Sequence, residues 1–130
     1  MKNSILRLAS LALLASLAQY RTFAAAQTLS SDEALAKKYE MILGRYQFEI
    51  GGEKPVIAFL IRQGGLWADS GDGRPAEIKP VNSLNEEFTG IDSENGRFDV
   101  TFIKDEDGRY TKCRFVMKSQ NVDATGKRVE

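Results

Sequence analysis

The chain has 130 residues, of which 42% are hydrophobic, and its 18 Lys and Arg residues balance 18 Asp and Glu residues. This length is typical of one domain, and the basic residues are interspersed with acidic ones, so neither nucleic acid nor a charged membrane surface is indicated as a partner. The sequence has no His, which excludes Ser-His-Asp and Cys-His catalysis and removes the commonest zinc ligand, so no metal or other cofactor is expected.

The first 26 residues have the pattern of a signal peptide. Lys2 and Arg7 accompany an apolar stretch over residues 8–17, and a run of three alanines ending at Ala26 resembles a cleavage site. The apolar stretch is shorter than the roughly 20 residues that a membrane-spanning helix needs. We therefore expect an exported protein, periplasmic or secreted after cleavage near Ala26, with no membrane insertion. The mature chain, residues 27–130, would carry a net charge of −3.

An N-terminal helix is predicted within residues 27–44. Ser30 and Glu33 have the spacing of a capping box, and Gly44 is placed to end the helix. One apolar stripe follows at helical spacing, formed by Leu35, Tyr39, Ile42 and Leu43. A helix of roughly 13 residues is marginal alone in water, so we expect this stripe to dock against the rest of the domain.

Residues 45–130 read as a β domain, because short apolar and polar alternations are separated by turns rich in glycine. The turns include Asn95-Gly96 and Asp107-Gly108, which tolerate the positive φ of tight hairpins. We expect strands at Arg45–Ile50, Val56–Ile61, Leu66–Asp69, Ala76–Val81, Glu87–Ile91, Arg97–Lys104 and Tyr110–Met117, with a weak eighth near Asn121–Thr125. The fold class is therefore mainly β: a small antiparallel β-barrel with one N-terminal α-helix. An open, strongly bent sheet wrapped on the helix is the alternative.

Two sets of apolar side chains are candidates for function. A barrel of short strands has room for side chains or one small ligand, so its bulky residues either form a plain core or line a partly open apolar cavity. These candidates are Tyr46, Phe48, Trp67, Phe88, Phe102 and Phe115. The segment Val56–Ile61 is apolar on both faces and needs a covering layer, either the helix or a partner. The candidate interface residues there are Ile57, Phe59 and Ile61.

The motifs that suggest chemistry have simpler interpretations. Gly71–Ala76 matches a dinucleotide fingerprint in form, but Pro80 follows too closely for the helix that this motif requires. Asp105–Asp107 lacks the spacing of a calcium loop and is read as a turn. The neighbours Glu86 and Glu87 point to opposite faces of a strand, so they cannot flank one substrate atom. Cys113, the single cysteine, is expected to be buried and inert.

The order of several short motifs carries a family resemblance. These are Leu43–Tyr46, Gly64–Trp67, Ile78–Pro80 followed by Phe88, Phe98–Phe102 and Asp105–Arg109. From Leu43 to about Val129 the chain resembles the lipocalin-like domain, of unknown function, that follows the catalytic domain in many serine beta-lactamase-type peptidases and esterases. The resemblance implies a lipocalin-like barrel with an accessory role in assembly or in shaping access to a neighbouring active site. This chain has no Ser-x-x-Lys motif, so the resemblance implies a freestanding version.

The sequence leaves two functions open. The first is an exported, non-catalytic binding or assembly module, which recognises a small apolar ligand or an unknown protein partner such as a hydrolase. The alternative is a small enzyme whose site is built from carboxylates, arginines, Tyr46 and Tyr110 inside an open barrel. We prefer the first, because no catalytic constellation is evident in the sequence.

Overall fold

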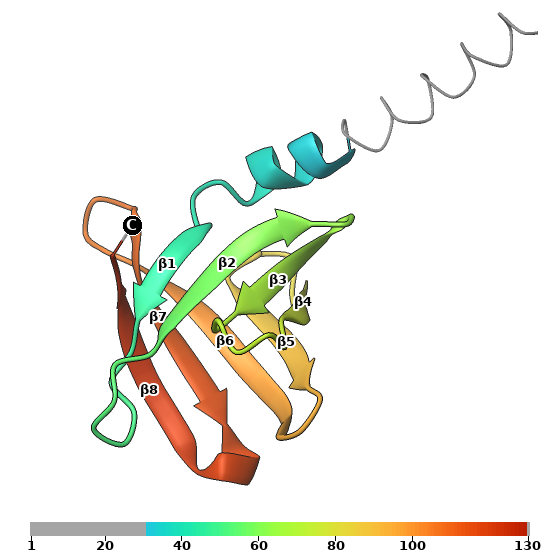
Figure 1. The fold of residues 1–130 in the computed structure, drawn as a ribbon. Helices are drawn as coiled ribbons and strands as arrows, with labels where there is room; N and C mark the ends of the chain where they lie inside the picture. Colours follow the sequence, from blue (N-terminus) through green and yellow to red (C-terminus); the bar gives the residue numbers. More distant parts are fainter. Residues whose placement is uncertain (1–30, 130) are drawn as a thin grey trace, which may run out of the picture.

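A computed structural model describes residues 31–129, and the predicted signal peptide lies outside these residues (Figure 1). A helix at residues 31–38 precedes the strands. The strands are β1 (Gly44–Gln47), β2 (Val56–Arg62), β3 (Gly65–Asp69), β4 (Ala76–Pro80), β5 (Glu87–Asp92), β6 (Gly96–Lys104), β7 (Tyr110–Met117) and β8 (Val122–Arg128), with a 3₁₀ turn η1 (Lys118–Gln120) between the last two.

The eight strands form a closed antiparallel barrel in chain order. Each strand pairs with its successor, and β8 returns to β1, where Tyr46 lies opposite Arg128 and Gln47 opposite Lys127. Beyond this pair, the backbone N–H of Val129 donates to the Arg45 carbonyl at 2.8 Å. The predicted barrel is therefore confirmed, and the open bent sheet is wrong because the two end strands meet.

Two strands, β1 and β8, differ in length from the prediction by more than one residue. β1 ends at Gln47 rather than Ile50, because Pro55, which directly precedes the facing strand β2, has no N–H with which to continue the ladder. Its carbonyl still accepts from Phe48 N–H at 2.9 Å. β8 continues past Thr125 through Gly126. A Cβ on Gly126 would lie 2.8 Å from the Gln47 carbonyl oxygen, so glycine permits β1 to approach closely at the seam instead of breaking the strand.

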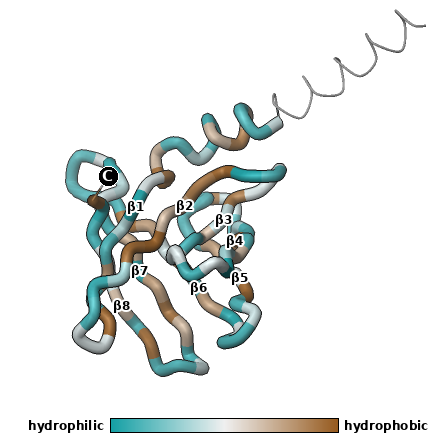
Figure 2. The backbone as a smooth tube through the Cα atoms, in the orientation of Figure 1, coloured by the Kyte–Doolittle hydropathy of each residue, from teal (hydrophilic) through white to brown (hydrophobic). Residues whose placement is uncertain are grey.

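The core fills the barrel with aromatic side chains. The largest fully buried residues are Tyr46, Phe48, Phe59, Phe88, Val100 and Cys113. Many rings meet edge to face, and the tightest pair, Phe59 and Phe102, has its centroids 4.9 Å apart. Figure 2 shows hydrophobic residues concentrated along β2, which supplies two inward side chains, Ile57 and Phe59, to this core.

The N-terminal segment covers one end of the barrel (Figure 1). The helix ends at residue 38, earlier than predicted, because the chain turns sharply toward β1 with Ile42 N–H donating to the Tyr39 carbonyl at 3.0 Å. Tyr39 and Ile42 join the core, and the Tyr39 ring meets Phe88 edge to face with centroids 5.8 Å apart. The predicted stripe therefore packs on the end of the barrel. We call residues 31–43 the cap.

Candidate functional site

The barrel interior has little free volume. Tyr46, Phe48, Phe88 and Phe102, predicted to line the core or a cavity, are each at most 2% exposed, and Phe115 is half-buried against them. A hollow of about 60 Å³ lies at the mouth opposite the cap, beside Ser70, Ala76 and Phe98. Ligand pockets usually have roughly 300–1,000 Å³, so in this conformation these rings act as core.

Trp67 lies outside the barrel, although the sequence analysis grouped it with the interior aromatics. The neighbouring Leu66 and Ala68 are buried, so the alternation of the strand directs Trp67 outward. Its indole N–H donates to the Arg62 carbonyl at 2.8 Å, and the Arg62 guanidinium lies 5.4 Å from the ring centroid. These contacts fix the ring on the outer surface.

The candidate interface on β2 is also placed differently from the prediction. Ile57 and Phe59 point into the barrel and are 8% and 2% exposed, while Ile61 is half-buried against the core. A partner cannot contact Ile57 or Phe59 while the barrel is folded. Of the three candidate interface residues, only Ile61 keeps part of its side chain accessible.

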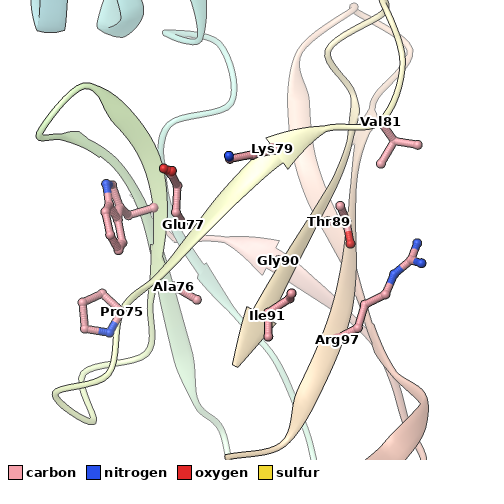
Figure 3. A pocket seen from close by; sticks show the side chains of 10 residues that line it. Pro75, Ala76, Glu77, Lys79, Val81, Thr89, Gly90, Ile91 and Arg97 are labelled. Carbon is pink, nitrogen blue, oxygen red and sulfur yellow. The ribbon is translucent and has the colours of Figure 1, made fainter. Parts of the chain in front are cut away.

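A groove of about 740 Å³ lies on the outer wall, and we call it the β4 groove (Figure 3). Its residues come from β3 to β6 and from the ends of β4. Trp67 and Glu77 line one side, Ile91 and Arg97 the other, and Pro75 and Val81 lie toward its two ends. The remaining lining residues are Ala76, Lys79, Thr89 and Gly90.

The groove forms because β4 and β5 diverge. They pair at only three positions, from Pro80 opposite Phe88 to Ile78 opposite Gly90, whereas β5 and β6 pair at six. Figure 3 shows the two strands separating beyond Gly90, toward Pro75. A Cβ on Gly90 would lie 2.5 Å from the Phe98 ring, so glycine lets this core ring reach the wall under the groove.

The groove combines exposed apolar side chains with charges of both signs. Ile91 is 74% exposed and Val81 56%. Neither the Glu77 side chain nor the Lys79 side chain has a hydrogen bond or ion pair with another residue in 31–129. The Arg97 side chain, by contrast, donates through Nε and Nη2 to the Asp99 carboxylate at 3.2 and 3.1 Å. Such a surface can bind an apolar group and orient its charged neighbours.

The two tyrosines considered for catalysis have separate structural contacts. The Tyr46 hydroxyl donates to the Ile42 carbonyl at 3.0 Å, and burial raises the pKa of Tyr46 to about 12. The Tyr110 hydroxyl donates to Glu86 at 2.8 Å, and burial, followed by this hydrogen bond, raises the pKa of Tyr110. Burial also raises the pKa of the Cys113 thiol, which disfavours the reactive thiolate.

Other kinds of site receive no support within the described part of the chain. No cluster of three or more carboxylate, His or Cys side chains there could hold a metal ion. Among residues 31–129, no helix has the length and apolar character needed to cross a membrane.

The sequence analysis did not identify the β4 groove as a site. The apolar outward residues Val81 and Ile91 could have indicated it, because polar side chains are usual at such positions. The divergence of β4 and β5 has no comparable signal in the sequence.

Comparison with family models, with curated proteins and with solved structures gives no match in any of the three. The resemblance to the accessory domain of beta-lactamase-type hydrolases therefore stays a prediction from the motifs.

Proposed function

We propose that the protein is an exported, non-catalytic binding and assembly module whose contact surface is the β4 groove. The observation that carries this proposal is the contrast between the 740 Å³ groove on the outer wall and the 60 Å³ hollow inside the barrel. Exposed apolar side chains such as Ile91 and Val81 favour association, because removing their surface from water is favourable. The motif resemblance to an accessory domain supports the same role.

A fluorescent apolar probe tests whether the groove binds. Trp67 is the only tryptophan of the chain and lines the groove, so the uncharged fluorophore N-phenyl-1-naphthylamine bound there will accept energy from it. We expect probe emission on tryptophan excitation. Ile91→Asp should weaken probe binding about tenfold, because it removes an apolar contact worth roughly 1.5 kcal/mol or more.

Leu84→Asp is the matched control. Leu84 is 71% exposed, nearly the same as Ile91, but does not line the groove, so its substitution should leave probe affinity unchanged. Equal affinity of wild type and Ile91→Asp, or equal weakening by both variants, would contradict the proposal. The titration uses dilute protein, so that association between protein molecules does not compete with the probe.

A further inference from the structure

The two sides of the β4 groove carry charges of both signs in opposite order. Glu77 lies opposite Trp67 in the β3–β4 ladder, and Arg97 lies opposite Ile91 in the β5–β6 ladder. Figure 3 shows Glu77 and Arg97 on opposite sides of the space between β4 and β5. Lys79 follows Glu77 on β4, and Asp99 follows Arg97 on β6, so along the strands the two sides carry negative and positive charges in opposite order.

Both charges have capacity for another partner. The Glu77 carboxyl group lies over Gly65, because a Cβ added to Gly65 would be 3.2 Å from the carboxyl carbon. The Glu77 side chain has no ion pair with another residue in 31–129. The hydrogen bonds from Arg97 to Asp99 use Nε and Nη2, which leaves Nη1 for a second carboxylate. At 69% exposure the Arg97 side chain is accessible to one.

Ile91 is an apolar projection beside an apolar hollow. Its side chain is 74% exposed, the most of any large hydrophobic residue in the described range. Pro75, Ala76 and Val81 give the adjacent groove apolar lining of its own. The same wall therefore presents both a projecting side chain and a hollow able to receive one.

We propose that the occupant of the β4 groove is a second copy of this chain, joined by a two-fold axis that runs parallel to the strands. Such an axis places the β4 side of one copy against the β6 side of the other, so that Lys79 of each copy also faces the partner's Asp99. Ile91 of each copy enters the groove of its partner, and Glu77 of each faces the partner's Arg97. The inference rests on the proposed function, because it names the partner of the same groove.

Charge complementarity favours a second copy over a ligand with one charge. A two-fold interface uses the same patch twice, so every favourable contact occurs in duplicate. An anionic or cationic ligand would pair with the groove residues of one sign and desolvate a residue of the other sign, which is costly. A second copy of this surface brings charges of both signs and the exposed Ile91 side chain, so its binding in the groove avoids this penalty.

Complementation between two charge variants tests this arrangement. Wild-type protein should show a concentration-dependent dimer by native mass spectrometry and sedimentation. Glu77→Arg and Arg97→Glu should each weaken self-association at least about tenfold, because each places like charges across the interface twice. An equimolar mixture of the two variants should recover a heterodimer, whose mass identifies it, because both facing pairs become oppositely charged.

The controls are Glu106→Arg and Arg109→Glu, which make the same charge changes in the exposed loop between β6 and β7. Each should dimerise like wild type, and their mixture should show no preference for the heterodimer. A wild-type monomer at every concentration, unchanged dimerisation of the groove variants, or a mixture that fails to recover would overturn the inference. If the probe still binds in an Ile91-dependent way to a monomer, the proposed function stands without the dimer.

Discussion

At the scale of single residues, Tyr46 combines a buried ring with a hydroxyl group that forms a hydrogen bond. Its ring is fully buried, while its hydroxyl satisfies the Ile42 carbonyl in the cap. The loss of water around the phenol raises its pKa to about 12, and the nearby positive charge of Arg128 opposes this shift. Because the folded pKa exceeds the ordinary value near 10, the folded state holds this proton more tightly than the unfolded state.

Tyr46 should therefore make folding sensitive to high pH. The stabilisation that comes from its raised pKa is complete below pH 10 and is lost as the pH rises toward 12. The free energy of unfolding should therefore fall by about 2 kcal/mol between pH 9 and pH 12. Denaturant titrations of wild type and Tyr46→Phe over this range measure it. The variant should lose about 1 kcal/mol at neutral pH with its hydrogen bond and show a flatter dependence; parallel curves would contradict the assignment.

Residue-scale prediction from sequence succeeded where alternation decided the face. Phe48 and Phe88 lie inside, as their strand patterns indicated, whereas Trp67 was grouped with the interior because of its size. The two buried neighbours of Trp67, Leu66 and Ala68, determine its outward direction. The alternation of side chains along the strand therefore predicts the outward direction of Trp67, whereas its side-chain volume does not.

At the scale of elements, the cap is fastened by the last strand. Arg128 of β8 donates to the carbonyls of Met41 at 3.0 Å and Tyr110 at 3.1 Å, and also to that of Leu43. Its guanidinium lies 5.8 Å from the centroid of the Tyr46 ring. At the other end of the cap, Gly64 N–H in the turn between β2 and β3 donates to Asp32 at 2.8 Å.

Arg128→Ala should loosen the cap. Three carbonyls lose a charged donor, so we expect a loss of about 2–3 kcal/mol in the free energy of unfolding. The amide hydrogens of residues 39–43 should also exchange faster, since the cap can then open without the barrel unfolding. Lys127→Ala, at the exposed neighbouring position, should stay within about 0.5 kcal/mol of wild type. Equal effects of the two substitutions would contradict the role of Arg128.

Sequence patterns predicted the presence of the strands and the helix better than the residues at which they end. Glycine turns and alternation located the strands of the meander, but Pro55 shortened β1 and Gly126 allowed β8 to continue. The helix was also shorter than its apolar spacing suggested, because Tyr39 and Ile42 enter the core through a turn. These differences arise from contacts between distant parts of the chain, which local patterns do not contain.

At the scale of the whole molecule, the closed barrel surrounds one aromatic core. This core makes Phe59 a structural residue: its ring contacts Tyr46 and Phe102 edge to face, with centroids 5.6 and 4.9 Å away. The sequence analysis had placed Phe59 at a candidate interface because both faces of β2 are apolar. The inner face of β2 is covered by the core itself.

Phe59→Asp should unfold the domain rather than change its oligomeric state. A carboxylate at a position that is 2% exposed has no partner, so we expect a loss above about 4 kcal/mol. Circular dichroism on heating measures the loss, and Leu60→Asp, on the half-exposed outer face of the same strand, should be far milder. A stable, folded Phe59→Asp monomer would contradict the core assignment.

The seam between β1 and β8 also affects how the molecule folds. Tyr46 of the first strand pairs with Arg128 of the last, so the barrel cannot close until all the strands between them are in place. Pairings between such distant positions form slowly, because a long loop must close first. The seam is therefore expected to be the last pairing to form, after the hairpins between neighbouring strands, so the step that closes the barrel should limit the rate of folding.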